Sequence, residues 1–376
     1  MLFFKPKSYL GVDLGSGGVK IVELKQEKKR PVLFTYGLTS QMEDIHRLFA
    51  IPETNNEMLS ADQKSKAQPV MVNQDQVKKY AQLIKSICAS AKVVAKTATV
   101  SLPVSVVFHA VINLPLLKKE DLDKVLRAEV KKLLPRPIDD MVLDYQMIKN
   151  STQSKTQRVL VNAVPKELVI FYTQVFKMAG IGLDALEPES IALERSLVGR
   201  DQSVAMIIDM GAERTNFYII DQGYAITHHS IEVGGERINK ILSEMLDVKE
   251  DLSEQIKYDY FGSLIKKDNN SQMNKENFFK TFFAVIDPII KEIEYGFELY
   301  LKQSGNENKR PEKIILTGGG SSMPFLTDYI SEKFNIKCYV GDPWGRVVYQ
   351  DGLKPLLHKI GPRMAVSIGM ALRNLV

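Results

Sequence analysis

Cysteine is scarce in this chain of 376 residues, which contains only Cys88 and Cys338. The two lie far apart and form no C-x-x-C pair. A disulfide framework and a cysteine-ligated metal site are therefore not expected. This use of cysteine is typical of a protein of the reducing cytoplasm.

Long apolar runs and a strong charge of one sign are also missing. No window approaches the roughly 18 apolar residues of a membrane-spanning helix. The amino-terminal Met-Leu-Phe-Phe-Lys-Pro-Lys-Ser has too short an apolar run for a signal peptide. The net charge of +5 is a mild excess, well short of the concentrated basicity of nucleic-acid-binding proteins. We expect a soluble, cytoplasmic protein of about two domains, able to work beside an anionic membrane surface.

What the chain does have is a pair of glycine turns, each preceded by an aspartate. The first, Gly11-Val-Asp-Leu-Gly-Ser-Gly-Gly-Val-Lys20, runs into an apolar strand rather than a helix. It therefore fits neither a Walker loop nor a dinucleotide fingerprint. Residues 205–220 repeat the order of strand, Asp-x-Gly turn and strand, with Asp209 at the end of the first strand. A third strand follows each hairpin, over 32–38 and 225–231, so the two halves of the chain begin alike.

A triphosphate with its Mg²⁺, held between two lobes, would explain this repetition. Glycines let backbone N–H groups approach phosphate oxygens, and Mg²⁺ keeps several waters, so Asp13 and Asp209 would face the hydrated metal. Lys20 could reach a phosphate, and Thr215 and Asn216 are the corresponding polar groups of the second hairpin. The alternative is that each hairpin is an ordinary Gly and Asp turn.

Two further glycine elements suit a nucleoside. An apolar strand from Lys313 leads into the loop Gly318, Gly319, Gly320 and Ser321, where a flat adenosine could lie against backbone beside a helix N-terminus. Gly234 and Gly235 lead into a predicted helix. There Glu236 and Lys240 share one face at i, i+4 and could touch ribose and base, or form a solvated ion pair.

In their order along the chain, the two Asp-Gly hairpins, the Gly234 helix start and the Gly318 loop resemble the elements of the actin/Hsp70/sugar-kinase ATPase superfamily. The resemblance implies an α/β, actin-like ATPase fold, with two lobes of duplicated mixed-sheet domains and ATP with Mg²⁺ in the cleft. The resemblance assigns Asp13, Gly15, Ser16 and Lys20 to the first phosphate motif, Asp209, Gly211, Ala212 and Thr215 to the second, and Gly318, Gly319, Gly320 and Ser321 to the adenosine motif. The further cofactor-binding candidates from the sequence are Gly17, Gly18, Asn216, Gly234, Gly235, Glu236 and Lys240.

Between the two hairpins lies a self-contained strand-and-helix unit. Residues 99–115 predict two strands, 120–134 a helix that stops at Pro135, 142–148 and 158–164 a hairpin, and 166–179 a helix. Its segments Leu134-Pro-Arg-Pro-Ile-Asp-Asp-Met-Val-Leu-Asp-Tyr-Gln and Val164-Pro-Lys-Glu-Leu-Val resemble the inserted 1C-type α/β subdomain of the PilM family of type IV pilus assembly proteins. The likeness runs nearly end to end.

The resemblance implies a division of the chain. Lobe I takes residues 8–98, with 178–200 and 350–376 returning to it, and 99–177 form the insert. Lobe II takes 201–240 and 310–349, with 241–309 as its second subdomain. The long polar stretch 40–75 departs from the family and predicts a flexible surface excursion.

The family resemblance also implies a function and partners. We expect a cytoplasmic ATP-binding protein of type IV pilus, or related secretion or competence, machinery. It would bind the cytoplasmic N-terminal segment of a PilN-like single-pass inner-membrane protein, in a nucleotide-dependent way, in a groove between the insert and the first lobe. Through that partner it would lie at the inner face of the membrane. Other pilus components and self-association are further possibilities; nucleic acid is not an expected partner.

Two alternatives remain open. A small-molecule kinase would need a general base in an acceptor pocket, and no such constellation is evident. Glu187 or Glu189, in the link between lobes, could position a hydrolytic water, so we expect at most a slow ATPase, with Asp13, Asp209 and Glu187 as its catalytic candidates. A cell-division protein of the FtsA type would carry a basic amphipathic membrane helix at its end, and residues 372–376 show none.

Overall fold

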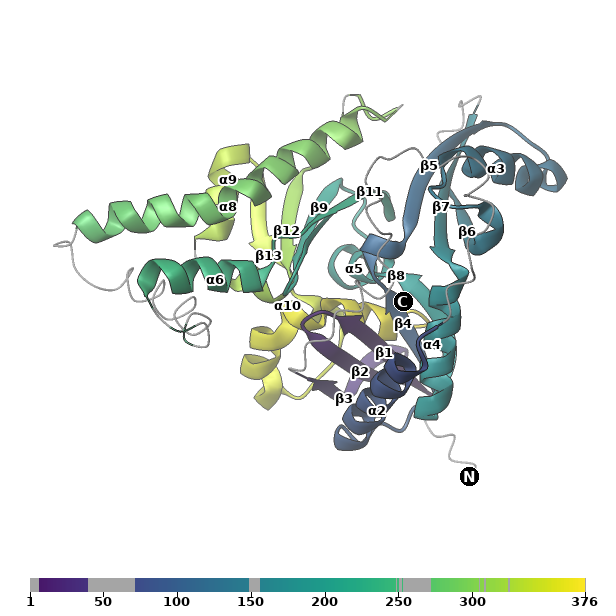
Figure 1. Cartoon of the computed structure of the whole chain (residues 1–376), viewed down its shortest axis with the longest axis horizontal. Helices are drawn as coiled ribbons and strands as arrows, with labels where there is room; N and C mark the ends of the chain where they lie inside the picture. Colours follow the sequence, from purple (N-terminus) through teal and green to yellow (C-terminus); the bar gives the residue numbers. More distant parts are fainter. Residues whose placement is uncertain are drawn as a thin grey trace.

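Two five-stranded sheets of the same topology form the body of the protein (Figure 1). The computed structural model describes residues 7–39, 72–148, 156–247, 249, 252, 272–303, 305–307, 309–323 and 325–375. The first sheet has the order β3-β2-β1-β4-β8, with β1 Ser8–Gly15, β2 Gly18–Glu27, β3 Arg30–Leu38, β4 Thr97–Leu102 and β8 Gly182–Pro188. The second has the order β11-β10-β9-β12-β13, with β9 Ala205–Met210, β10 Thr215–Asp221, β11 Tyr224–Ile231, β12 Lys313–Thr317 and β13 Lys337–Val340.

Each sheet is an antiparallel three-stranded meander extended by two parallel strands. The duplicated hairpins predicted from the sequence are thus confirmed as equivalent elements of two lobes. The central strands are continuous apolar runs, such as Met206, Ile207 and Ile208 of β9, which are fully buried. Such runs are typical of strands that are covered on both faces.

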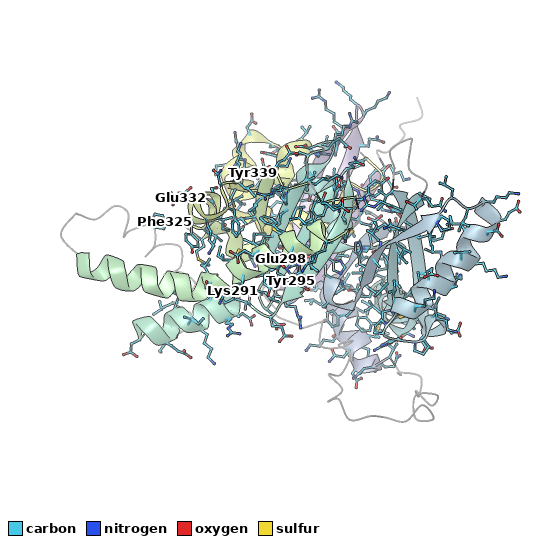
Figure 2. The ribbon with its side chains drawn as sticks, turned by 90° about the horizontal axis from the view of Figure 1, so that it is seen from above. Lys291, Tyr295, Glu298, Phe325, Glu332 and Tyr339 are labelled. Carbon is cyan, nitrogen blue, oxygen red and sulfur yellow. The ribbon has the colours of Figure 1, made fainter. Side chains whose placement is uncertain are left out.

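Helices cover both faces of the sheets. In the first lobe, α2 (Gln74–Ser90) and α4 (Lys166–Ala179) pack on one face, and α10 (Lys354–Ala371) packs on the other. In the second, α8 (Gln272–Leu301) lays Ile286, Ile289, Ile290 and Ile293 against the sheet. Its solvent side carries Lys291, Tyr295 and Glu298 (Figure 2), as expected for an amphipathic helix. Three further helices of the two lobes, among the described residues, are α5 Glu189–Leu193, α6 Gly235–Leu246 and α9 Leu326–Phe334.

The insert is a small antiparallel sheet of order β5-β7-β6, covered by one helix. Its elements are β5 Phe108–Pro115, α3 Lys119–Leu133, β6 Met141–Ile148 and β7 Thr156–Pro165. The predicted strands and helix of this region are confirmed. The predicted insert boundaries at 99 and 177 fall within β4 and α4, which pack in the first lobe. The predicted excursion 40–75 lies outside the described residues up to 71, and α2 begins at Gln74.

The insert leaves the first lobe but packs on the second. Ile148 of β6 and Leu160 of β7 belong to the buried core of the second sheet. The ring of His109 on β5 lies 4.7 Å from that of His228 on β11, and Tyr224 donates to the carbonyl of Met147 at 3.3 Å. Figure 1 shows β5 beside β11. No helix within the described residues is long and apolar enough to cross a bilayer.

Helix α10 packs closely against both sheets. Its Ala365, Val366 and Met370 lie in a core with residues of the second sheet, while its Met364 and Ile368 pack on the first. A Cβ on Gly11 of β1 would lie 2.0 Å from the carbonyl oxygen of Ser367. The close approach of strand and helix therefore requires glycine at this position.

Gly11→Ala tests this contact. We expect it to lower the free energy of unfolding by about 1–3 kcal/mol, the range typical of overpacking, because the obstructing atoms are backbone. Urea unfolding measures the change. Gly352→Ala is the control, since nothing lies within 4 Å of its added Cβ, and it should change stability by less than about 0.5 kcal/mol. Equal stability of the two variants would contradict the proposed close packing.

Candidate functional site

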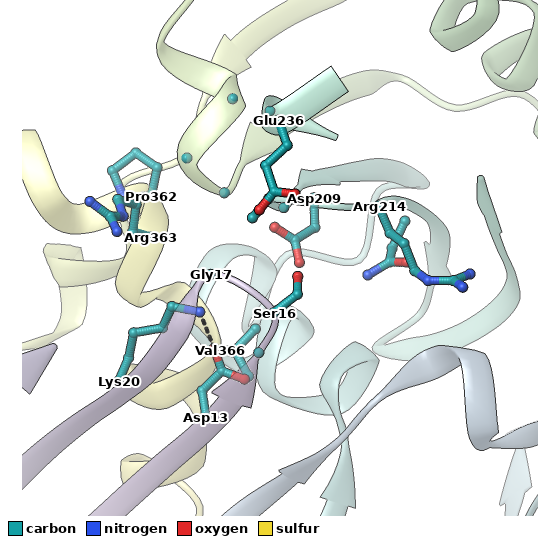
Figure 3. Close-up of a pocket in the computed structure, with 18 of the residues that line it drawn as sticks. Asp13, Ser16, Gly17, Lys20, Asp209, Arg214, Glu236, Pro362, Arg363 and Val366 are labelled. Carbon is teal, nitrogen blue, oxygen red and sulfur yellow. Dashed lines mark hydrogen bonds and ion pairs between the residues drawn. The ribbon is translucent and has the colours of Figure 1, made fainter. Parts of the chain in front are cut away.

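A cavity of about 280 Å³ lies where the two Asp-Gly turns, the Gly318 loop and the first turn of α6 meet α10. Asp13 and Lys20 lie on one side, Asp209 and Glu236 on the other, and Ser16 between them (Figure 3). The predicted site residues brought together in its lining are Asp13, Gly15, Ser16, Gly17, Lys20, Asp209, Gly211, Ala212, Asn216, Gly235, Glu236, Gly318, Gly319 and Gly320. Elements more than 300 positions apart thus share one cavity.

The first turn fixes its aspartate tightly. Asp13 is 5% exposed. Its Oδ1 accepts a hydrogen bond from Ser101 Oγ of β4 at 2.9 Å, and its Oδ2 accepts one from Lys20 Nζ at 3.2 Å. Lys20 faces Asp13 across the β1–β2 hairpin. The predicted phosphate cation is therefore positioned at the cavity by its ion pair with the predicted metal-facing carboxylate.

The second turn is braced by two neighbours. The N–H groups of Gly235 and Glu236, at the start of α6, donate to the carbonyls of Gly211 and Ala212, both at 2.9 Å. Gly318, at φ +81°, approaches from the other side, where a Cβ would lie 2.5 Å from Asp209 Oδ1. Glycine is needed there both for the backbone conformation and for the close approach. The N-terminus of α6 and the Gly318 loop thus pack against the turn that carries Asp209.

Several predicted site residues do not line the cavity: Gly18, Thr215, Gly234, Lys240, Ser321 and Glu187. Most of them shape the turns instead. Gly18 closes the first hairpin at φ +102°, Thr215 Oγ1 donates to the Val233 carbonyl, and Ser321 Oγ donates to the Gly318 carbonyl. Lys240 is exposed. The cavity side of α6 carries Glu236 and Asn239, at i, i+3 rather than i, i+4.

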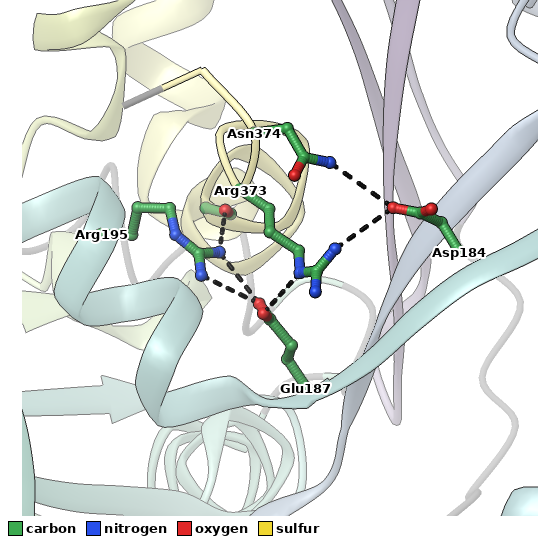
Figure 4. A network of polar contacts seen from close by, with 6 residues as sticks. Asp184, Glu187, Arg195, Arg373 and Asn374 are labelled. Carbon is green, nitrogen blue, oxygen red and sulfur yellow. Dashed lines mark hydrogen bonds and ion pairs between the residues drawn. The ribbon is translucent and has the colours of Figure 1, made fainter. Parts of the chain in front are cut away.

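The prediction of Glu187 as a catalytic residue is corrected by its surroundings. Its carboxylate accepts two hydrogen bonds from Arg195, both at 3.0 Å, and one from Arg373 Nε at 2.7 Å (Figure 4). Arg373 also contacts Asp184, and Arg195 donates to the Gly369 carbonyl of α10. Glu187 therefore joins β8 to the end of α10 and lies outside the cavity.

Glu189, two residues further on, lines the cavity in its place. It is 5% exposed, and its Oε2 lies 3.5 Å from Asn216 Nδ2 and 3.4 Å from the Tyr218 hydroxyl. Burial, and then the charges of Asp13 and Asp209, raise its pKa well above the usual range. The sequence places both glutamates in the link between lobes. The position of the end of β8 determines that Glu189, and not Glu187, faces the cavity.

Asp209 is also shifted. Burial, and then the charge of Asp13, raise its pKa from 3.8 to about 7, and Lys20 opposes the shift. Three carboxyl groups thus converge with little water to solvate them, an arrangement that a cation would relieve. Among the described residues, no group of three His, Cys, Asp or Glu side chains could hold a metal directly.

Five residues that line the cavity were not among the predicted site residues: Arg214, Asn239, Pro362, Arg363 and Val366. Three of these lie on α10. The Pro362 carbonyl accepts hydrogen bonds from Gly318 N and Thr317 Oγ1, both at 3.0 Å, so α10 holds the Gly318 loop in place. Arg363 lies beside Gly319. No local motif marks Pro362, Arg363 and Val366, because only the packing of α10 brings them to the site.

The family model for the type IV pilus assembly protein PilM matches residues 11–375. The chain belongs to this family. A chain of a PilM–PilN type IV pilus biogenesis complex superimposes with a TM-score of 0.73 over 98% of each chain, at 20% identity. MreB 5 of Spiroplasma citri bound to AMPPNP gives 0.52 at 12% identity, over 99% of this chain and 97% of that one. These similarities confirm the actin-like fold.

Cell division protein FtsA of Enterococcus faecalis is 27% identical over 195 residues, which are 48% of this chain and 44% of FtsA. The chain thus matches less than half of the length of this curated relative. The FtsA alternative rests on this partial match, whereas the PilM family match extends over nearly the whole chain.

The pKa of Asp209 predicts a pH-dependent stability in Mg²⁺-free buffer. Between pH 4 and 7 the folded chain keeps a proton that the unfolded chain loses, so wild-type stability falls as pH rises through this window. Asp209→Asn removes the effect. We expect its gain in stability over wild type to grow from pH 4 to pH 7 and then to level off, as measured by urea unfolding across that range.

Asp201→Asn is the control of opposite sign. Hydrogen bonds from Lys313 and Ser203 lower the pKa of Asp201 from 3.8 to about 2. Its ionised form therefore favours folding above pH 4, and that contribution is lost as pH falls toward 2. This variant should be less stable than wild type near neutral pH. A pH-independent stability difference for Asp209→Asn would contradict its raised pKa.

Proposed function

We propose that this chain binds Mg-ATP between its lobes and, in that state, holds the cytoplasmic N-terminal segment of a PilN-like inner-membrane protein for pilus assembly. The observation that carries the proposal is the convergence of two Asp-Gly turns and a glycine loop on one cavity. The family match supports the pilus role. The MreB 5 structures with AMPPNP and ADP support a nucleotide in this fold.

The lining suggests a role for each group. Asp13 and Asp209 would face the water ligands of Mg²⁺, and Lys20 would exchange Asp13 for a phosphate oxygen. Gly318 to Gly320, with Arg363 beside them, leave a backbone surface for the adenosine. Bound Mg²⁺ would supply the positive charge that the buried carboxyl groups lack. Glu189, not Glu187, is the candidate to orient a hydrolytic water, and turnover should be slow.

The position of the insert supports a nucleotide-dependent interaction. It is covalently part of the first lobe, yet Ile148 and Leu160 are buried in the second. A ligand that fixes the angle between the lobes would therefore fix the insert as well. The geometry of any groove between the insert and the first lobe would then depend on nucleotide occupancy.

The surface of the insert suits a short extended peptide. Leu116 and Leu133 are 67% and 53% exposed, and Val142 of the outer strand β6 is 42% exposed. Leu116 follows β5 and Leu133 ends α3, whereas Val142 lies on β6 itself. Adding an extended peptide to an outer strand such as β6 is a recurrent mode of binding that needs no catalytic residues. A PilM–PilN complex among the similar structures supports a PilN-like partner. Through that partner the chain would lie at the cytoplasmic face of the inner membrane.

Asp209→Ala tests the proposal. We expect it to weaken binding of Mg-ATP by about 10- to 100-fold, the loss typical when a group that orients metal ligands is removed. Calorimetry with Mg-ATP measures the first effect. Binding of a fluorescent peptide from the PilN-like protein, with and without Mg-ATP, measures the second, and should weaken in parallel.

Asp201→Ala is the matched control, because Asp201 is an aspartate of the same lobe outside the cavity. It should leave both affinities unchanged. Unchanged nucleotide affinity in Asp209→Ala would contradict the two-carboxylate site. Peptide binding that ignores Mg-ATP would contradict the coupling, and binding of a tubulin-like division protein instead of the peptide would favour an FtsA-like role.

A further inference from the structure

Arg214 is the positively charged residue of the second Asp-Gly turn. Its carbonyl accepts a hydrogen bond from Gly211 N at 2.8 Å, so its side chain begins within the turn that closes on Asp209. Arg214 also lines the cavity, where Lys20 and Arg363 are the other described cations. Lys20 is paired with Asp13 on the opposite hairpin, and Arg363 lies beside Gly319 of the adenosine loop. The second turn therefore has one described cation of its own.

In the structure this cation is directed away from the carboxyl groups. Figure 3 shows the Arg214 guanidinium pointing away from Asp13 and Asp209. It forms an ion pair with Glu232, just after β11. The Glu232 side chain is 77% exposed, whereas that of Arg214 is 21% exposed. An ion pair with such an exposed carboxylate contributes little, because water and salt compete for it.

We propose that Arg214 is a binding residue for the terminal phosphate of the nucleotide, and that it exchanges Glu232 for that phosphate when a nucleoside triphosphate is bound. This inference rests on the proposed function of the cavity. The planar guanidinium binds phosphate through two parallel N–H···O bonds, in a geometry that the ammonium of lysine does not reproduce. A diphosphate lacks the group in question and leaves Arg214 with Glu232.

The exchange would also change the charge beside the strand on which the insert packs. Glu232 follows β11, whose His228 and Tyr224 contact the insert. The next residue, Val233, accepts a hydrogen bond from Thr215, and Gly234 is packed so tightly that a Cβ would lie 2.3 Å from the Ala212 carbonyl. Glu232 is thus joined to the phosphate turn on one side and to the insert-contacting strand on the other.

The test compares the ratio of Mg-ATP to Mg-ADP affinity, measured by calorimetry, among wild type, Arg214→Gln, Arg214→Lys and Glu232→Gln. In Arg214→Gln the ratio should fall by about tenfold, which corresponds to about 1.4 kcal/mol. Arg214→Lys should restore only part of it, because lysine binds phosphate as a point charge. Glu232→Gln should raise the ratio about two- to threefold, because Arg214 is then released from its competing partner.

The possible outcomes separate the two proposals. If Arg214→Gln binds both nucleotides with the wild-type ratio, the role of Arg214 is overturned and the nucleotide site stands. A lower ratio in Glu232→Gln would also overturn the exchange. If wild type binds neither nucleotide, the proposed function fails, and the inference fails with it. Circular dichroism of each variant separates loss of binding from loss of folding.

Discussion

The contact of α10 with both sheets is the constraint on which the rest of the structure depends. A Cβ at Gly11 of β1 would meet the Ser367 carbonyl of α10 at 2.0 Å, and a Cβ at Gly369 of α10 would meet the Ala192 carbonyl of α5 at the same distance. Because backbone meets backbone at both points, no side chain there can yield. The same helix supplies part of the cavity wall, and Arg373 just beyond it binds Glu187.

The carboxyl cluster that this packing creates is unfavourable without a ligand. Burial and mutual repulsion raise the pKa of both Asp209 and Glu189, so ionising these carboxyl groups at neutral pH reduces the stability of the fold. The proposed cation and phosphates would reverse this effect, because a ligand that binds only the folded state stabilises it. Stability given up at a functional site is a recurrent compromise in proteins.

The elements that sequence analysis predicted well are those that a few neighbouring residues determine. Both Asp-Gly hairpins are local, since two neighbouring apolar strands and a glycine turn fix their geometry. The Gly318 loop is equally short. Which side chains of these elements face the cavity depends on how the elements pack against one another. The way β8 ends points Glu189 rather than Glu187 into the cavity, and the docking of α6 presents Asn239 rather than Lys240. The residues of α10 carry no local signal, because a distant part of the chain brings them to the site.

The interface between the insert and the second lobe shows which signals can reach the insert. Burial lowers the pKa of His109 and lowers that of His228 to about 3, so both rings are neutral at physiological pH. Their neighbours Ile148 and Leu160 are aliphatic. Because neither ring changes charge near neutral pH, modest changes of pH leave their contact unchanged. Beyond this contact β11 continues into Glu232, which is ion-paired with Arg214 of the second Asp-Gly turn.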